Sequence, residues 1–284
     1  MDKVLLSISQ IADPDQREVI IPNEYTKIGD GAFGHCEKLE KVVIPDSITE
    51  IEEGAFRGCT SLKEVVISGS VIKIGWEAFF GCNSLVSVNI PASVIEIGEG
   101  VFIGCASLER IVVAADNRVY CSIDGVLYSK DQTVLLCVPK TISAFLILDS
   151  VTEIGRWAFK TCHSLRSIVI PNSVVKIGDG AFCGCTSLES ITLPKSITEI
   201  GEGVFNHCTS LESITLPNSV TKIGRMAFYA CTSLASITLP DSVTKIGEMA
   251  FWRCISLERV SVPQAARWED NTFMNCPKLK IIRR

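Results

Sequence analysis

Cysteine and histidine are the side chains best suited to chemistry in this chain, which contains thirteen of the first and three of the second. A cysteine thiolate is a nucleophile and a metal ligand, and histidine is its usual companion in zinc sites. No C-x-x-C or H-E-x-x-H motif is present, and His35, His163 and His207 are far apart in the sequence. The nearest approach to a ligand pair is Cys183-Gly184-Cys185, which is weak support for a redox or metal site. We therefore expect no metal and no cofactor.

Two other motifs that could indicate catalysis do not fit their surroundings. Gly29, Gly31 and Gly34 match the dinucleotide fingerprint G-x-G-x-x-G by letter. A functional fingerprint opens the helix of a βαβ unit, and the pattern around these glycines indicates no such unit. Serine is abundant, yet the G-x-S-x-G nucleophile motif does not occur. The sequence therefore predicts that the chain is not an enzyme and has no catalytic residues.

The spacing of the cysteines accounts for most of them. Phenylalanine recurs every 23 residues in two runs; a cysteine follows each phenylalanine by three residues, and a leucine follows each cysteine by three. These phenylalanines are Phe33, Phe56, Phe79 and Phe102, then Phe159, Phe182, Phe205, Phe228 and Phe251. A fixed period of this length indicates a solenoid, in which each repeat buries its apolar face against its neighbours. The cysteines then form a ladder inside the coil, where a thiol packs as a small hydrophobe.

The start of each repeat has the pattern of a β-strand. In the repeat that begins at Leu188, the stretch L-x-x-I-x-L is the strand signature of leucine-rich repeats. Leu188, Ile191 and Leu193 should therefore point inward. Pro194 follows and should end the strand, because proline has no N–H for the ladder.

The rest of the repeat predicts a turn, a second strand and a bend. We expect the Ser196 hydroxyl to satisfy backbone groups of the turn and residues 198–200 to form a short strand. Residues 202–208 resemble one helical turn, whose inward side chains would be Val204, Phe205 and Cys208. The predicted fold is a leucine-rich-repeat solenoid of α/β type: a right-handed, β-rich coil with short helical turns. Its parallel concave sheet should have about 12 rungs.

One interval of the array is longer by 34 residues, between Phe102 and Phe159. Asp124-Gly125 lies between β-rich runs and predicts a hairpin. Strands over 119–123, 126–129 and 133–138 would make a three-stranded meander that projects from the coil. Ile142, Phe145 and Ile147 then return to the repeat register and supply an extra rung. Insertions between repeats tend to lie on the binding side, and an inert spacer is the alternative.

These features predict a single solenoid domain over residues 1–284. Its parts are an irregular N-terminal cap (1–15), a first repeat block (16–113), the inserted meander with its extra rung (114–147) and a second repeat block (148–284).

The repeats read LxxIxLPxSVTxIGxxAFxxCxSL almost throughout, as in Leu211 to Leu234. The chain in this respect resembles the BspA-like group of leucine-rich repeats over about residues 16–282. The insert also resembles one carried by that group, through Asn117-Arg-Val-Tyr120 and Asp124-Gly-Val-Leu-Tyr128. The resemblance implies a surface or secreted protein of bacteria or protists that adheres to host matrix proteins or to other cells. It implies no catalytic residues.

Charge and hydropathy restrict the partners. The formal net charge is −5, and lysine and arginine are scattered, so neither nucleic acid nor an anionic membrane surface is expected as a ligand. No stretch approaches the ~18 apolar residues of a membrane span, so membrane insertion is not expected. The first residues do not form a signal peptide, and a thiol ladder suits a reducing or anaerobic setting. Because the resemblance implies the cell surface, the sequence leaves localisation open.

The last outward position of L-x-x-I-x-L forms a column along the predicted concave sheet. The column starts with Ile20, Val43, Val66, Asn89, Val112, Leu146 and Val169, and continues with Thr192, Thr215, Thr238 and Ser261. An exposed aliphatic run on a soluble protein often marks a contact site. The alternative is that β-branched residues simply suit strands. Valine and threonine suit strands about equally, so propensity does not explain the change from aliphatic to hydroxyl side chains.

Three hypotheses of different classes follow. The first is a non-enzymatic recognition or adhesion module that binds a protein through the concave face near the insert, at Ile20, Val43, Val66, Asn89, Val112, Leu146 and Val169. The second is a structural spacer or a self-associating repeat array of a larger surface protein. The third, a thiol- or metal-dependent redox protein, rests only on the cysteine ladder.

Overall fold

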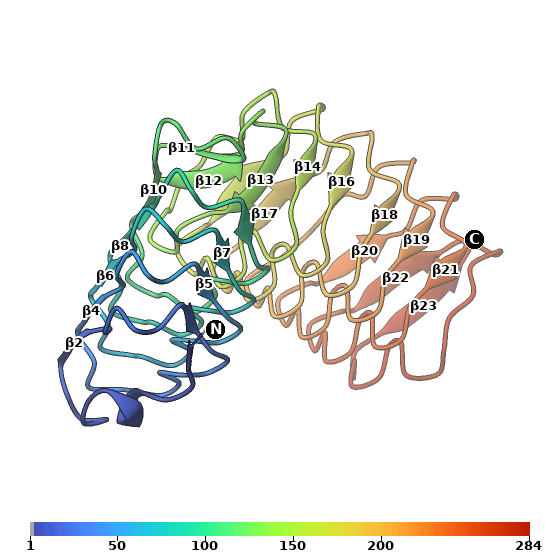
Figure 1. Ribbon diagram of the computed structural model, residues 1–284. Helices are drawn as coiled ribbons and strands as arrows, with labels where there is room; N and C mark the ends of the chain where they lie inside the picture. Colours follow the sequence, from blue (N-terminus) through green and yellow to red (C-terminus); the bar gives the residue numbers. More distant parts are fainter. Residues whose placement is uncertain (1–2) are drawn as a thin grey trace. The chain divides into compact units, whose positions relative to one another are not determined.

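The computed structural model describes residues 3–284 and is a β-solenoid of about 12 coils that contains almost no helix (Figure 1). Contacts within the chain group it into two compact units. Unit 1 comprises Met1–Asp131 with Cys137–Thr141, and unit 2 comprises Gln132–Leu136 with Ile142–Arg284. The single domain over 1–284 stays a prediction.

Each repeat of unit 1 contributes one longer and one two-residue strand, and like strands of successive repeats lie side by side (Figure 1). The long strands are β2 (Glu18–Ile20), β4 (Lys41–Val43), β6 (Glu64–Val66), β8 (Ser87–Ile90) and β10 (Arg110–Val113). The short strands are β1 (Val4–Leu5), β3 (Lys27–Ile28), β5 (Glu50–Ile51), β7 (Lys73–Ile74) and β9 (Glu96–Ile97). All pairings among them are parallel.

Unit 2 repeats this arrangement. Its long strands are β15 (Ser167–Val169), β17 (Ser190–Thr192), β20 (Ser236–Thr238), β22 (Arg259–Val262) and β23 (Lys280–Arg283). Its short strands are β14 (Glu153–Ile154), β16 (Lys176–Ile177), β18 (Glu199–Ile200), β19 (Lys222–Ile223) and β21 (Lys245–Ile246). The short second strand expected within residues 198–200 is therefore confirmed.

The inward side chains form continuous stacks. The rings of Phe33, Phe56, Phe79 and Phe102 stack with centroids 4.8–5.9 Å apart in unit 1. From Phe159 to Phe273 the corresponding spacing in unit 2 is 4.8–5.7 Å. Stacking of this kind adds to the burial of each ring and fixes the register of neighbouring repeats. The predicted inward residues Leu188, Ile191, Leu193, Val204, Phe205 and Cys208 are all buried.

The short helical turn predicted for residues 202–208 is wrong. The N–H groups of Gly203, Phe205 and His207 donate to carbonyls of the next repeat, at 2.8–2.9 Å, and not to residues four positions earlier. Gly203 and His207 have φ of 59° and 58°, in the left-handed region. Two such residues per repeat break any helix and turn alternate amides toward the neighbouring coil. Sequence periodicity identified the inward side chains correctly but not the backbone.

The hydroxyl expected to stabilise the turn does so across the repeat boundary. The Ser196 hydroxyl donates to the carbonyl of Val174 in the preceding repeat, and Ser219 and Ser242 do the same to Ile197 and Val220 at 2.6 Å. A serine in this column therefore links neighbouring repeats.

The N-terminal segment is more regular than predicted. Val4–Leu5 form β1, which pairs with β3, and Ile8–Gln10 form a 3-10 helix, η1, capped by Ser7. Leu5 and Ile8 are buried and cover the end of the core, which explains why the segment is ordered. Met1 and Asp2, also part of the predicted cap, lie outside the described residues.

The insert forms the expected hairpin but does not project from the coil. β11 (Tyr120–Ile123) and β12 (Val126–Ser129) pair antiparallel around Asp124 and Gly125, which both have positive φ, as a type I′ turn requires. The Ile111 amide of β10 donates to the Gly125 carbonyl at 2.8 Å, and that of Val113 to the Ser122 hydroxyl at 2.9 Å. The hairpin thus lies along β10.

The third strand of the predicted meander, β13 (Val134–Cys137), follows β11 and β12 in one five-stranded sheet of order β11-β12-β13-β14-β16. The three predicted strands are therefore confirmed as neighbours. β13 also pairs in parallel with β14 of unit 2, and an alternating apolar pattern does not reveal this second neighbour. The extra rung is present only as side chains: Ile147 is buried and Phe145 contacts Phe159 edge-on at 5.9 Å, but residues 142–148 form no strand.

Candidate functional site

The aliphatic column predicted from the sequence is divided between the two units. In unit 1, Ile20 lies opposite Val43 and Val43 lies opposite Val66 on successive parallel strands. Ile20 is 74% exposed and Val66 42%, whereas Val43 between them is half-buried. These three side chains are neighbours on one outward sheet face. They form the continuous part of the column.

Asn89 and Val112 form the next pair of the column in unit 1. They are cross-strand partners on β8 and β10, and both are exposed. Asn89 makes this stretch partly polar. Val112 is followed directly by Val113, whose amide is bonded to the hairpin, so this end of the column adjoins the insert. We call Ile20, Val43, Val66, Asn89 and Val112 the unit 1 column.

Leu146 and Val169 belong to unit 2. Leu146 is 83% exposed and Val169 is 63% exposed. Val169 lies opposite Thr192, where the hydroxyl part of the column begins. Leu146 lies in the stretch that forms no strand, so its place in a sheet column is not confirmed.

Charged side chains on one side of the unit 1 column pair with each other. Glu40 accepts hydrogen bonds from Arg17 and, at 2.7 Å, from Lys63 in the repeats before and after it. Lys41 and Glu64 are 3.0 Å apart. The bonds from Lys63 and Arg17 lower the pKa of the Glu40 carboxyl. Because these charges satisfy one another, they leave the apolar side chains as the unpartnered groups of this face.

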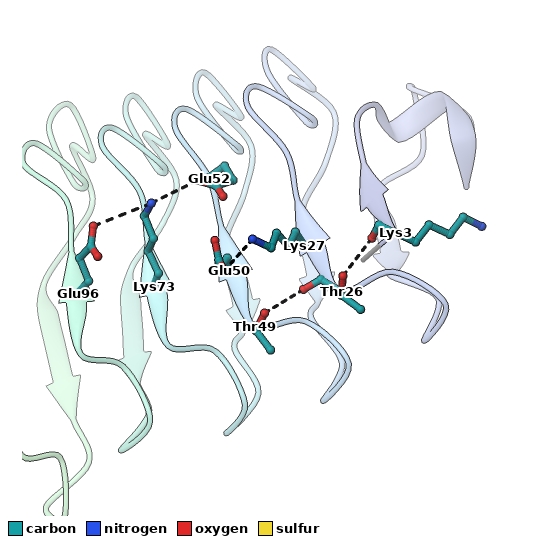
Figure 2. Close-up of polar contacts among 8 residues, drawn as sticks. All are labelled: Lys3, Thr26, Lys27, Thr49, Glu50, Glu52, Lys73 and Glu96. Carbon is teal, nitrogen blue, oxygen red and sulfur yellow. Dashed lines mark hydrogen bonds and ion pairs between the residues drawn. The ribbon is translucent and has the colours of Figure 1, made fainter. Parts of the chain in front are cut away.

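The short strands of unit 1 carry a second ladder of alternating charge. Lys27, Glu50, Lys73 and Glu96 follow one another as cross-strand partners, as Figure 2 shows. Lys27 and Glu50 are 2.8 Å apart, and Lys73 lies 3.5 Å from Glu52 and 4.0 Å from Glu96. Opposite charges at directly opposed strand positions stabilise neighbouring repeats.

Threonine hydroxyls run beside this ladder. Thr49 donates to the carbonyl of Thr26 at 3.3 Å, and Thr26 donates to that of Lys3 at 3.5 Å (Figure 2). In the next two repeats the same position is occupied by Ile72 and Ile95, which are both exposed. The Ile95 amide donates to the Ile72 carbonyl at 2.9 Å, so the two are neighbours.

Ile72 and Ile95 form a second aliphatic pair, which lies outside the single column predicted from the sequence. A scan of every column for a change of residue type would have found Ile72 and Ile95. It would also have singled out Trp76, an exposed aromatic residue. The next residue, Glu77, has a φ of 50° and lies 2.6 Å from Arg57, whose guanidinium covers the Phe80 ring at 4.6 Å.

The cysteine ladder has a structural role. Most ladder thiols donate to the carbonyl of the phenylalanine in the preceding repeat, as Cys82 does to Phe56 at 3.2 Å and Cys208 to Phe182 at 3.2 Å. Burial raises the pKa of the Cys105 thiol to about 12. A thiol held neutral in the core is a poor nucleophile and a poor metal ligand.

The other chemistry-bearing residues do not come together. Cys185 is buried in the ladder while Cys183 is half-buried, and burial raises the pKa of the Cys183 thiol. Within residues 3–284 no group of three or more His, Cys, Asp and Glu side chains is placed to hold a metal ion. Gly29, Gly31 and Gly34 lie in the bend that carries Phe33 into the core, with no helix after them.

The fold and the surface define a class of protein, a repeat solenoid with a tightly stacked interior and extended outward faces. The family model for the BspA-type leucine-rich repeat region matches residues 13–121 and 144–280 in six copies. The chain belongs to this family. A search of curated proteins finds no match.

Solved structures agree with this assignment. A leucine-rich cell surface protein from Faecalibacterium prausnitzii is 30% identical, with a TM-score of 0.63, over 94% of this chain and 78% of that one. A leucine-rich repeat protein from Eubacterium ventriosum has 24% identity and a TM-score of 0.71, over 93% and 84% of the two chains. The pneumococcal vaccine antigen PcpA has 22% identity and a TM-score of 0.73, over 94% and 79%. The last two show likeness of fold alone.

The family is one of repeat proteins, and none of these structures is named as an enzyme. Membership favours protein interaction or adhesion in general terms. Among residues 3–284, no helix has the length and apolar character needed to cross a membrane.

Proposed function

We propose that this chain is a non-enzymatic recognition or adhesion module that binds a protein partner through the unit 1 column, near the insert. The observation that carries the proposal is the side-by-side placement of Ile20, Val43 and Val66 on one outward face. An apolar run at successive strand positions has no role in the core, because each repeat already buries its inward residues. Exposed apolar patches of this kind mark contact sites.

The surroundings of the column favour a protein over other ligands. The flanking Arg17, Glu40 and Lys63 pair with one another, so the face offers little net charge to a charged partner. Burial of apolar surface contributes roughly 25 cal/mol per Å², and a protein surface with its own apolar side chains gains most from it. The similar Faecalibacterium prausnitzii chain is a cell surface protein, and adhesion at a cell surface fits such a contact.

The alternative is that the same face joins copies of this chain, as in a spacer or self-associating array. Native mass by light scattering separates the two for the wild type and for Val43→Asp/Val66→Asp. If both the wild type and the variant are monomers, the face is free and an external protein partner is supported. A wild-type oligomer that the variant converts to a folded monomer would replace the proposal with self-association.

A binding screen against purified extracellular-matrix proteins is the functional test. Val43→Asp/Val66→Asp introduces two charges into the column, and Thr192→Asp/Thr215→Asp introduces the same charges at equivalent positions of unit 2. We expect the first variant to lose binding and the second to keep it. If both variants bind as tightly as the wild type, the unit 1 column is not the contact surface.

A further inference from the structure

The long strands of unit 2 depart from the charge pattern of unit 1 at one place. In unit 1 every charged residue on the long strands that has a charged cross-strand partner faces the opposite sign, as Glu18, Lys41 and Glu64 do. On β22 and β23 of unit 2, Arg259 lies directly opposite Lys280. Like charges at opposed strand positions destabilise a sheet. The facing cations Arg259 and Lys280 therefore destabilise the pairing of β22 with β23.

The two cations line an open groove of about 650 Å³ on the outward face of these strands. Lys278 lines the same groove, and Glu258 is its one acid. Within residues 3–284, no carboxylate lies within ion-pair distance of Arg259, Lys278 or Lys280. The groove thus presents two net positive charges on a chain whose net charge is −5.

The rest of the groove is lined with hydroxyls. Ser236 and Thr238 of β20 are exposed, and Ser261 of β22 is half-buried opposite Thr238. Hydroxyl side chains donate and accept hydrogen bonds in the same positions, which suits the hydroxyl groups of sugars. Thr238 and Ser261 belong to the hydroxyl part of the outward column, which begins at Thr192.

A second run of cations in unit 2 shows why charge alone is not the criterion. Lys222 lies opposite Lys245 on the short strands β19 and β21. Lys222 pairs with Glu199 at 3.2 Å, and the surrounding groove also contains Glu202, Glu248 and Glu269. These acids neutralise that run. The cations at β22 and β23 have one acid among them, so their charge is available to an anionic ligand.

We propose that the groove formed by β20, β22 and residues 278–280 binds an anionic polysaccharide. The sulfate or carboxylate groups of the glycan would bridge Arg259 and Lys280, with Lys278 at the rim, and its hydroxyl groups would contact Ser236, Thr238 and Ser261. Arginine and lysine form charge-assisted hydrogen bonds with both kinds of anion. This site is on a different unit from the unit 1 column and is independent of the protein-binding proposal.

The test uses the full chain and two probes, a heparin-derived octasaccharide and a non-sulfated polyuronate of similar length. Titration calorimetry at about 100 mM NaCl compares the wild type with Arg259→Gln/Lys280→Gln. Loss of two charge-assisted contacts should weaken binding about tenfold or more. The matched control, Lys222→Gln/Lys245→Gln, removes an equivalent cross-strand pair of cations from the other sheet and should change affinity less than about twofold.

Binding of either probe, lost in the first variant and kept in the control, supports the site, and the two probes show whether sulfate or carboxylate is preferred. Equal weakening by both variants would mean general charge attraction and would overturn the proposal. The proposal would also be overturned if the wild type bound a poly-glutamate peptide as tightly as either glycan. The serine and threonine hydroxyls of the groove would then contribute nothing to affinity. If the double variant does not fold, Lys278→Gln, exposed and outside the strands, still decides, with an expected loss of about threefold.

Discussion

In the repeats that have an Ile-Gly step, the glycine is predicted to be required by the close approach of neighbouring coils. A Cβ on Gly75 would lie 2.6 Å from the carbonyl carbon of Glu52 and 2.7 Å from the amide nitrogen of Glu53. Gly75→Ala therefore forces two backbones apart. Gly31 has a φ of 60° and would meet nothing within 4 Å, so Gly31→Ala changes only the backbone preference.

The loss of unfolding free energy in Gly75→Ala follows from the backbone contacts that must shift. The clash adjoins the bonds from the Gly75 amide to Ile51, at 2.7 Å, and from the Gly54 amide to Trp76, at 2.9 Å. Weakening both costs about 1–3 kcal/mol, and overpacking adds about 1–3 kcal/mol. The unfolding free energy should fall by about 3 kcal/mol for Gly75→Ala. For Gly31→Ala the left-handed backbone costs about 1 kcal/mol.

Urea unfolding followed by far-UV circular dichroism measures both variants. The midpoint should fall by about 1 M or more for Gly75→Ala and by clearly less for Gly31→Ala. Glu52 occupies the same position as Gly75 in the preceding repeat, so one repeat already accommodates a Cβ there. If the two alanine variants lose the same stability, neighbouring coils relax readily and close approach is not the reason for glycine.

Three other outcomes are expected. Arg253 has a φ of 58° and is exposed, so Arg253→Gly should raise the unfolding free energy by about 0.5–1 kcal/mol in the same assay, and a loss would contradict the strain argument. Burial raises the pKa of the Cys105 thiol from its ordinary 9.0 to about 12, so between these values the folded state binds more protons and stability falls as pH rises. Above pH 9 the unfolding free energy should fall by up to about 1.4 kcal/mol per pH unit for this thiol. Cys105→Ala should therefore reduce the slope of the urea midpoint against pH in that range. An unchanged slope would rule out this thiol as a cause. Lys73→Glu places a third acid between Glu50 and Glu96 and should cost about 1–2 kcal/mol at low salt, with most of the loss removed by about 0.5 M NaCl; a salt-independent loss would point to packing instead.

The sequence predicted the stack of repeats well because the interior is repetitive. Phe205, Cys208 and Leu211 recur at fixed spacing, and side chains that recur at one spacing must occupy one layer of the core. The hairpin at Asp124-Gly125 was predictable for a local reason, since both residues tolerate positive φ.

What the sequence did not predict depends on backbone partners. The bend at 202–208 has helical side-chain spacing, but its amides bond to the next repeat, and spacing alone does not distinguish the two. The parallel pairing of β13 with β14 is likewise a choice of neighbour. Of the candidate surface, the register of Ile20, Val43 and Val66 was predicted correctly, whereas Leu146 lies in a stretch without strand structure.

The central claim is that the unit 1 column is the surface by which this protein binds a protein partner. The most direct measurement is the ratio of dissociation constants, by biolayer interferometry, for the matrix protein bound in the screen. Val43→Asp/Val66→Asp should weaken binding about tenfold or more, while Thr192→Asp/Thr215→Asp leaves it within about twofold. If the unit 1 variant is folded and binds as tightly as the wild type, the column is not the contact surface.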